Sequence, residues 1–432
     1  MASTAMAQTT GTLYKVTRVG QDVLGGQTND HAQCIMTMSP NGQYVAGVRF
    51  GATTRGFYMT TGTPVVTEIP KVTGSSPYAL ANDINDSGNS VGHEKWTSGA
   101  NVNVIAWFHN RTAGTTVRLL TPFDANASIT AIPTSMTSDS AYAFGSVDSD
   151  GPAGPTLAVG GYWNLSTRAW TAISGVREVL DASADGTKLL VIGTDGSGKI
   201  LSGSVAGGWP TTVYSYTTPR SAGKVSPNGR YVGASQRISG VPTPFIYDTV
   251  AGTRTNLALV SPQDNLGGII GAVSDTGRAL GTIYTSGAAG SFAVLWTSPT
   301  AAYTRVSNLL VSDGHTALQP SLTSWNVYNG GDGMSADGLT WGVYGSGPLG
   351  FEDSLLWQQQ CPAITVTPTT LADGTVGALY TATLNAAGGS GSYTWTAGGA
   401  GGGASSGGGD SDHREWCGRQ CHCPCYRCQW LL

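Results

Sequence analysis

Residues 224–236 read KVSPNGRYVGASQ, and close variants of this phrase recur along the chain. TMSPNGQYVAGVR occupies 37–49, INDSGNSVGHE occupies 84–94 and VSDTGRALGTI occupies 273–283. Each copy has a short apolar lead, a turn that ends in glycine, and a segment in which apolar and polar residues alternate. Glycine supplies the positive φ that two-residue hairpin turns require. Each copy therefore predicts a β-hairpin.

The spacing of these hairpins indicates a repeat protein. A degenerate copy, MTSDSAYAFGS at 136–146, fills the one double-length gap, which gives seven copies mostly 43–50 residues apart. In most units the hairpin is followed by an aromatic strand, a polar turn and another strand, as in GYWNLSTRAWTAI at 161–173. Four strands per unit at this period predict the blades of a β-propeller. The turn glycines of the other six copies are Gly42, Gly88, Gly186, Gly229, Gly277 and Gly338.

The two ends of the repeat region predict how the ring closes. The seventh unit offers only three strands, whereas TLYKVTRVG at 12–20 is a lone strand without a unit. We expect this strand to complete the last blade, because closure removes open sheet edges that invite aggregation. The predicted fold class is all-β, with a seven-bladed propeller at 12–360 closed by the N-terminal strand. Residues 1–11 are interpreted as the remnant of an export signal or a disordered start.

One pair of segments carries a family resemblance. ANDINDSGNSVGHEKW at 81–96 and VIAWFHNRTAG at 104–114 resemble the HAF repeats of bacterial extracellular proteins. Those repeats combine an Ile-Asn-x-x-Gly hairpin with an aromatic strand, and the resemblance covers roughly residues 12–357. It implies a secreted or surface-displayed bacterial protein. It implies no single activity.

A different composition follows the repeats. Residues 361–397 resemble the first half of a bacterial Ig-like domain, through GTVG at 374–377 and the Tyr-Thr-Trp triplet that ends at Trp395. Since a complete sandwich needs around 100 residues, only a partial Ig-like β segment is expected. Residues 398–432 are rich in glycine and then in cysteine, and we expect them to be disordered or out of frame. Zinc binding and thiol cross-linking are the alternatives for the cysteines of this tail.

Composition excludes some classes of partner. Charged residues make up 11% of the chain, against about 25% in an average globular protein. The net charge is −4 and no basic stripe is present, which argues against binding to nucleic acid. No apolar run approaches the roughly 20 residues needed to span a bilayer. We expect a secreted or cell-surface monomer without a membrane-spanning segment.

Two further expectations concern cysteines and metals. Ring closure would bring Cys34 and Cys361 to the same sector, where a disulfide would fix the seam of an exported protein. Two separate buried thiols are the alternative. No cofactor or metal is expected. Asp148 and Asp150 could bind calcium, but an ordinary Asp-Gly turn is the favoured interpretation of this segment.

The long loops between second and third strands, and between blades, lie on one face of a propeller. Rigid scaffolds place function on such variable loops. Aromatic side chains beside amides and carboxylates suit sugar rings, and a hydrophobic plug at the channel mouth is the alternative for the aromatic residues of the 311–332 insertion. The predicted binding residues are Trp96, His315, Trp325, Asn326 and Tyr328.

The favoured function is non-catalytic binding or scaffolding, with a glycan or a surface protein as ligand. The alternative is a secreted glycan-active hydrolase or lyase, with Glu94, Asp313 and His315 as its acid and base groups. Two carboxylates about 5–10 Å apart would be the minimum for glycoside hydrolysis. A structural spacer without a ligand is the third hypothesis.

Overall fold

A computed structural model shows two compact units, Met1–Gln358 and Gln359–Leu432, which we call the N-terminal and the C-terminal unit. Within them the structure describes residues 9–10, 13–19, 33–49, 53–73, 76, 78–98, 101–123, 129–151, 154–155, 158–217, 219–259, 266–285, 291–315, 329–346, 352–360, 365–367 and 385–387.

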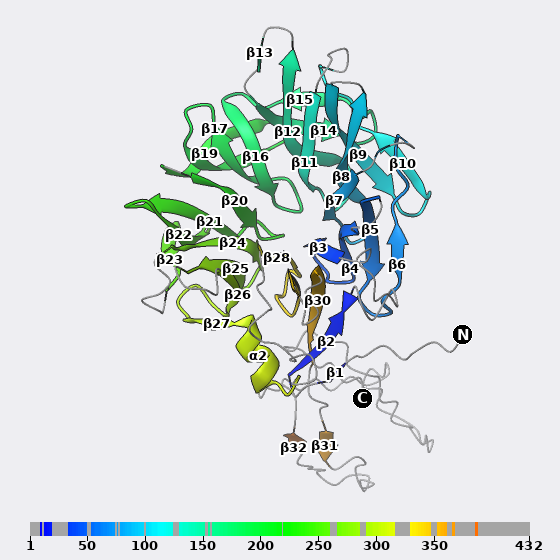
Figure 1. The fold of residues 1–432 in the computed structure, drawn as a ribbon. Helices are drawn as coiled ribbons and strands as arrows, with labels where there is room; N and C mark the ends of the chain where they lie inside the picture. Colours follow the sequence, from blue (N-terminus) through cyan, green and yellow to red (C-terminus); the bar gives the residue numbers. More distant parts are fainter. Residues whose placement is uncertain are drawn as a thin grey trace, which may run out of the picture. The chain divides into compact units, whose positions relative to one another are not determined.

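Four sheets of the N-terminal unit each contain four antiparallel strands in chain order (Figure 1). The first comprises β3 (Gln33–Met38), β4 (Tyr44–Arg49), β5 (Arg55–Thr60) and β6 (Val66–Glu68). The second comprises β16 (Val176–Ala182), β17 (Lys188–Gly193), β18 (Gly198–Ser204) and β19 (Gly208–Tyr216). The third comprises β20 (Pro219–Val225), β21 (Tyr231–Ile238), β22 (Val241–Asp248) and β23 (Thr253–Asn256). The fourth comprises β24 (Gly268–Val273), β25 (Ala279–Tyr284), β26 (Ser291–Trp296) and β27 (Tyr303–Arg305).

Two larger sheets complete this unit. One has nine strands: β7 (Tyr78–Ile84), β8 (Ser90–Ser98), β9 (Asn101–Asn110), β10 (Thr115–Arg118), β11 (Ile129–Met136), β12 (Tyr142–Gly151), β13 (Gly154–Pro155), β14 (Val159–Asn164) and β15 (Trp170–Ala172). It consists of two antiparallel meanders joined by one parallel pair, Thr130 with Val104. The other has the order β1 (Thr9–Thr10), β2 (Tyr14–Arg18), β30 (Glu352–Gln359), β29 (Thr340–Ser346) and β28 (Asn329–Met334). The all-β prediction is confirmed, and no sheet of the described residues closes on itself.

Each predicted turn closes an antiparallel hairpin. In the 224–236 copy, the N–H of Gly229 donates to the carbonyl of Ser226 (2.8 Å), and the N–H of Ser226 donates to the carbonyl of Tyr231 (2.8 Å). The equivalent pair of hydrogen bonds recurs at the other six turns. Gly229 has φ +73°, a left-handed conformation that explains the glycine at this position. The seven copies of the sequence phrase are therefore seven copies of one hairpin.

The third copy tests this explanation, because Ser140 stands where the others have glycine and has φ 59°. Its Oγ accepts hydrogen bonds from the side-chain amides of Asn85 (2.7 Å) and Asn89 (3.0 Å). Relief of backbone strain in Ser140→Gly would stabilise by about 1 kcal/mol, whereas two lost hydrogen bonds cost about 1 kcal/mol each. We expect a net loss of about 1 kcal/mol in urea unfolding. An equal or higher stability of this variant would contradict the assigned role of Ser140.

The turns are also bonded to one another, in an arrangement that we call the turn belt. Four of its links join backbone groups of successive turns. They run from Ser138 N–H to Ala184 O (2.8 Å), from Ala184 N–H to Pro227 O (2.8 Å), from Asp275 N–H to Ala336 O (2.8 Å), and from Ala336 N–H to Pro40 O (2.6 Å). A fifth link joins the side-chain amide of Asn85 to Ser138 O (3.0 Å).

In the four backbone links the donor is the N–H of the second turn residue. Two turns have proline at this position, and proline has no N–H to donate. After Pro40, the N–H of Asn41 donates instead, and its acceptor is the carboxylate of Asp86 in the next turn (2.8 Å). The same replacement follows Pro227, where the N–H of Asn228 donates to Asp275 (2.9 Å). An aspartate thus compensates for each proline, and the seven links together return to the first turn.

The region after β27 differs from its prediction. The sequence predicts strand, turn and strand over 293–310; β26 and β27 form these two strands, but the second one ends at Arg305 and a helix, α2 (Val306–Ser312), follows. Val306 and Leu310 lie one turn apart on this helix and are both buried, at 2% and 1% exposure. Fewer than two turns of helix leave too short a periodic pattern to recognise in a sequence rich in strands.

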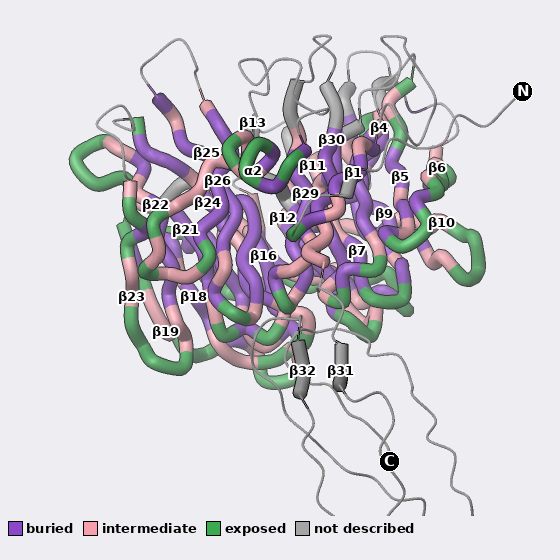
Figure 2. Tube along the Cα trace, turned by 90° about the horizontal axis from the view of Figure 1, so that it is seen from below, coloured by how far each residue is buried: buried purple, intermediate pink, exposed green. Residues whose placement is uncertain are grey.

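The packing follows the pattern expected for stacked sheets. Figure 2 shows buried residues along the middle of the strands and exposed residues at the turns. The cores between sheets are rich in aromatic residues, and Trp107, Trp163, Trp296, Trp341 and Trp357 are among the largest side chains that are fully buried. Among the described residues, no helix has the length and apolar character that a membrane span requires.

The C-terminal unit is described only at β31 (Thr365–Thr367) and β32 (Asn385–Ala387), which pair antiparallel. The Ig-like marks at 374–377 and the tail at 398–432 lie outside the described residues. Cys34 is buried in β3, but Cys361 also lies outside, and no disulfide is present among the described residues. The disulfide and Ig-like assignments stay predictions.

Candidate functional site

The first strands of the seven hairpins (β3, β7, β11, β16, β20, β24 and β28) form the centre of the N-terminal unit. Each lies against the next, and β28 lies against β3. In each of them the register shifts before the turn, for example between Ala81 and Asp83 in β7 and between Val179 and Asp181 in β16. A β-bulge of this kind re-aims the side chain that follows it. The residue after the shift is Thr37, Asp83, Ser135, Asp181, Gly223, Ala272 or Gly333.

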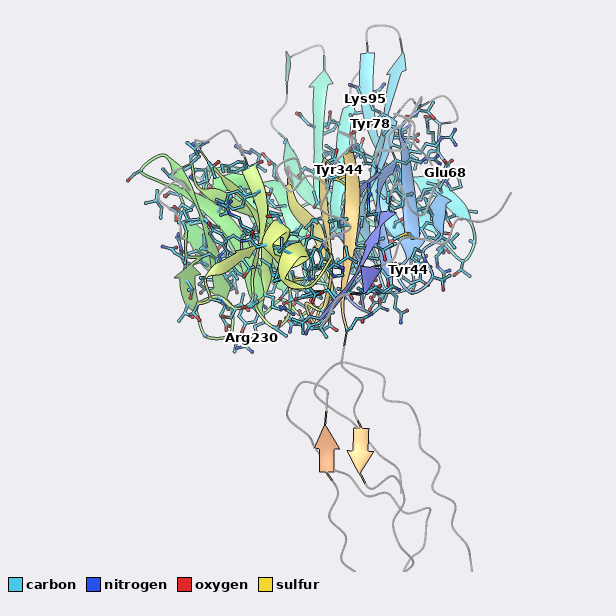
Figure 3. The ribbon with its side chains drawn as sticks, turned by 60° about the horizontal axis from the view of Figure 1, so that its bottom comes forward. Tyr44, Glu68, Tyr78, Lys95, Arg230 and Tyr344 are labelled. Carbon is cyan, nitrogen blue, oxygen red and sulfur yellow. The ribbon has the colours of Figure 1, made fainter. Side chains whose placement is uncertain are left out.

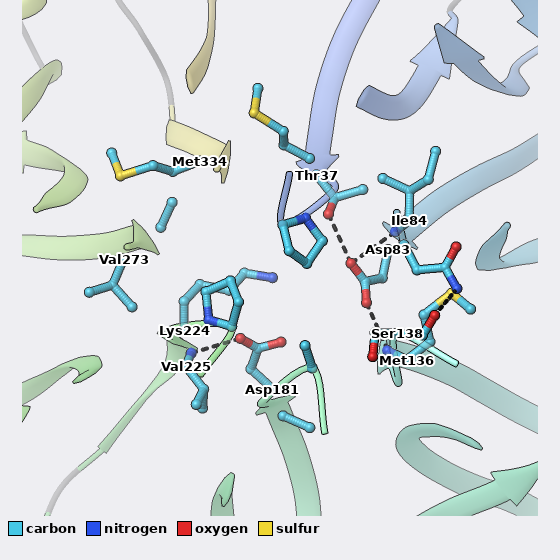
Figure 4. A pocket seen from close by; sticks show the side chains of 17 residues that line it. Thr37, Asp83, Ile84, Met136, Ser138, Asp181, Lys224, Val225, Val273 and Met334 are labelled. Carbon is cyan, nitrogen blue, oxygen red and sulfur yellow. Dashed lines mark hydrogen bonds between the residues drawn. The ribbon is translucent and has the colours of Figure 1, made fainter. Parts of the chain in front are cut away.

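A cavity of about 70 Å³, which we call the central pocket, lies where these strands end (Figure 4). All seven first strands or their turns contribute to its lining. Most of the lining residues are apolar in type, but polar atoms form the larger part of the pocket surface, and its charged groups are Asp83, Asp181 and Lys224. A volume of this size admits a few water molecules or one small chemical group, and no sugar chain.

Asp83 connects three of the first strands. Its Oδ1 accepts hydrogen bonds from the hydroxyl of Thr37 (3.0 Å) and from its neighbour Ile84 N–H (2.9 Å). Its Oδ2 accepts from the N–H of Met136 (2.7 Å). Burial raises the pKa of Asp83 to about 7, and the negative charge of Asp181 adds to the rise. The Asp83 carboxyl therefore holds β3, β7 and β11 together at the pocket.

Asp181 has the corresponding role further along the chain. Its Oδ2 accepts a hydrogen bond from the N–H of Val225 (2.7 Å), which joins β16 to β20. Burial raises its pKa as well, while the positive charge of Lys224 lowers it. Figure 4 shows the side chains of Asp83, Asp181 and Lys224 directed into the same pocket.

The raised pKa of Asp83 predicts a specific dependence of stability on pH. Between about pH 4 and 7 the folded state keeps a proton that the unfolded state has released, so this group's contribution to stability falls as pH rises. We expect Asp83→Asn, which cannot titrate, to be more destabilising at pH 5 than at pH 8, by about 2–3 kcal/mol. Urea unfolding of both proteins at the two pH values measures this difference. A difference that is constant or larger at pH 8 would show that Asp83 is ionised in the folded protein near neutral pH.

The central pocket lies on the face opposite to the one chosen from the sequence. Its lining ends at the short turns, beside which lie Tyr44 and Arg230, on the lower side of Figure 3. Tyr78 and Lys95, which flank the long-loop end of β7 and β8, lie on the upper side. The sequence prediction favoured the long loops because they are variable, but much of their length is outside the described residues.

Glu94 holds a buried position in β8. It is 0% exposed, and its two carboxylate oxygens accept hydrogen bonds from the N–H groups of Val72 (3.2 Å) and Thr73 (2.7 Å). A carboxylate in this position fixes the segment that leads into β7. Both oxygens already bind backbone donors, so neither is placed to act on a substrate.

Asp313 and His315 lie together just after α2. The Asp313 carboxylate accepts hydrogen bonds from the N–H groups of Leu13 (2.6 Å) and Tyr14 (2.8 Å), and Nε2 of His315 lies 2.8 Å from its Oδ2. Both are buried, at 3% and 0% exposure, and His315 packs edge-on against Trp357. The sequence analysis gave His315 as a binding residue and both residues as alternative acid and base groups; the structure shows both side chains buried, and these roles stay predictions. The pair binds the start of β2 to the rest of the unit.

Of the predicted acid and base groups, Asp313 and His315 are bonded to each other, whereas the hydrogen bonds of Glu94 go to Val72 and Thr73. Among the described residues, no three His, Cys, Asp or Glu side chains form a group that could hold a metal ion. Trp325, Asn326 and Tyr328 lie outside the described residues, as do the side chains of Trp96 and Asp150. Asp148 lies in β12 and is half-buried, and the calcium alternative stays a prediction.

A second and larger cavity, of about 580 Å³, opens between the outer strands β15 and β19, and we call it the lateral pocket. Its apolar lining includes Tyr162, Ile173, Leu201 and Trp209, and its polar lining includes three Ser or Thr residues and Lys199. The sequence prediction missed this pocket, because it depends on how two adjacent sheets pack and on no loop motif.

Comparisons of the sequence with known proteins identify no family for this chain. No family model matches the sequence, and no curated protein matches it either. The HAF-repeat and Ig-like resemblances therefore stay predictions.

Among solved structures, the chain is similar to a chain of a mitotic checkpoint complex, with 11% identity, 75% of this chain and 86% of that chain covered, and a TM-score of 0.46. It is also similar to TolB from Acinetobacter baumannii (13% identity, 74% and 81% covered, TM-score 0.39). A third is hydrazine synthase from Kuenenia stuttgartiensis (14% identity, 77% and 98% covered, TM-score 0.40). These are β-propeller-like proteins. With TM-scores below 0.5, these likenesses indicate no function for the chain.

Proposed function

We propose that the N-terminal unit is a seven-bladed β-propeller closed by β2. Three observations support this. The seven first strands contact one another in succession, from β3 to β28 and back to β3. The turn belt links all seven hairpins. Finally, β2 lies beside β30, so a strand from the start of the chain completes the sheet of the last hairpin.

We further propose that this propeller is a non-catalytic binding or scaffolding domain of a secreted or cell-surface protein. One observation carries the non-catalytic assignment: Glu94 and Asp313 are buried, and each accepts two backbone hydrogen bonds. A general acid or base must reach the reacting group with a free oxygen. The hydrolase alternative therefore has no supporting observation among the described residues.

The ligand class proposed is a glycan or a surface protein. A low content of charged residues and an abundance of Ser, Thr and Gly favour recognition by hydroxyl and backbone groups over recognition of strongly charged ligands. The central pocket is too small for a saccharide, at about 70 Å³. The lateral pocket has the volume of a small-molecule site, a class that spans roughly 300–1,000 Å³.

A paired assay tests the proposed function. The full chain is screened on a glycan array, and every bound glycan is then incubated with the protein and analysed for released products. We expect binding without turnover. Release of products would overturn the non-catalytic assignment, and absence of both binding and turnover would favour the spacer hypothesis over glycan binding.

A further inference from the structure

We propose that the lateral pocket binds a neutral saccharide. This inference rests on the proposed binding function and assigns it a site and a ligand class. The pocket is formed by β14, β15, β18 and β19, by the turn between β18 and β19, and by residues 173–176, which join β15 to β16 and include its first residue. Its volume of about 580 Å³ gives space for a short oligosaccharide.

The apolar part of the pocket suits the flat face of a sugar ring. The rings of Tyr162 and Trp209 lie 5.8 Å apart at an interplanar angle of 63°. The indole N–H of Trp209 donates to the carbonyl of Gly186 (3.0 Å), so its polar group is satisfied inside the protein. Trp209 therefore offers only carbon surface to the pocket, next to Ile173 and Leu201.

Hydroxyl groups surround this apolar surface. Thr171, Ser174 and Thr212 are exposed, and Tyr162 is half-buried. None of these four hydroxyls has a hydrogen-bond partner within the part of the chain that the structure describes. Hydroxyls arranged around an aromatic surface complement a ligand whose own hydroxyls surround an apolar ring face.

The backbone leaves room for such a ligand. Gly175 and Gly208 lie at positive φ (+73° and +71°), and a Cβ added at either would meet no atom within 4 Å. Glycine at these two positions is required by the backbone conformation, and it also keeps the pocket free of side chains.

The charged groups of the lateral pocket favour a neutral ligand. Lys199 alone carries a charge among the described lining residues, and its ammonium lies 2.9 Å from the carboxylate of Asp195. A phosphorylated or acidic ligand would find no free cation here, and a cationic ligand would find no carboxylate in the lining. A wholly apolar ligand would leave the hydroxyls without partners.

The test uses isothermal titration calorimetry on the full chain with maltotriose, cellotriose, mannotriose and chitotriose, and with sialyllactose as an acidic comparison. The variants Tyr162→Phe, Thr171→Val and Thr212→Val each remove one hydroxyl while keeping the shape. Thr211→Val is the matched control, because Thr211 is the exposed neighbour of Thr212 on β19 and does not line the pocket.

We expect at least one neutral saccharide to bind, with an affinity about tenfold lower in each pocket variant and unchanged in Thr211→Val. Binding that is equal in all four variants would overturn the site and leave the proposed function standing. Preference for sialyllactose, or no binding by any neutral saccharide, would overturn the ligand class. Cleavage of a saccharide, by contrast, would overturn the proposed function itself.

Discussion

Replacement of Asp313 by alanine is expected to destabilise the N-terminal unit by about 3–5 kcal/mol, because it removes a buried carboxylate that is bonded on several sides. Leu13 N–H and Tyr14 N–H would lose their acceptor, and His315 would lose the group that lies 2.8 Å from its Nε2. Each buried polar group left without a partner costs about 1–3 kcal/mol. Two of the three lost contacts bind the start of β2, so this strand is expected to detach first.

Urea unfolding measures the change in stability, and limited proteolysis followed by mass spectrometry shows where the chain opens. Ser312→Ala is the control, since Ser312 is the exposed neighbour of Asp313 at the end of α2. We expect new cleavage near residues 13–18 in Asp313→Ala only. Unchanged stability together with an intact N-terminus would refute the role of Asp313 as the group that holds β2.

Replacement of Glu94 by alanine is expected to cost a similar amount, about 3–5 kcal/mol, for a related reason. Its carboxylate is 0% exposed and is the acceptor for the N–H groups of Val72 and Thr73. Removal leaves both donors without an acceptor and a cavity beside β8. The free energy of unfolding by urea measures the effect.

Glu68→Gln is the matched control for Glu94. Glu68 is also a glutamate with two partners, Arg49 (2.9 Å) and Arg55 (2.5 Å), but its side chain is 36% exposed. Ion pairs at the surface contribute about 0–1 kcal/mol, so the control should change little. A stable Glu94→Ala protein that loses a measurable hydrolase activity would support the enzyme alternative in place of the structural role.

The hairpins could be predicted from sequence because a local rule determines them. Positive φ at the last turn position favours glycine, and this leaves a visible mark every time the turn is used. Ser140 shows the limit of the rule, since its left-handed conformation depends on bonds to Asn85 and Asn89 from the preceding hairpin. Only the period of the repeat indicated that a turn belonged there.

The two carboxyl groups of the central pocket could have been predicted from the sequence, but the sequence analysis did not identify them. Asp83 and Asp181 occupy the same position of the repeated phrase, immediately before the apolar residue that precedes each turn. Alignment of the seven copies on their turns would have placed both carboxyls at the centre of the fold. The raised pKa of Asp83, however, depends on burial and on its distance from Asp181, and no local pattern specifies these.

Some other side chains were misjudged because burial is a property of the assembled sheets. His109 stands beside a polar turn in the sequence, yet it lies in β9 at 2% exposure, with a hydrogen bond to the hydroxyl of Thr116 (3.0 Å). Glu94 and Asp313 were the alternative acid and base groups because they belong to long loops, where function is commonly placed. In this fold each is stabilised by backbone N–H donors from a segment that is distant in the sequence.

The central claim is that the ring is closed by the strand at the start of the chain, and hydrogen–deuterium exchange tests it most directly. The peptide that covers residues 12–20 of the full-length protein is followed together with peptides from β28, β29 and β30. If β2 completes this sheet, its amides should exchange as slowly as those of β30, and Asp313→Ala should accelerate β2 well before β28. Exchange of residues 14–18 at the rate of an unstructured peptide, while β28 to β30 stay protected, would contradict the account.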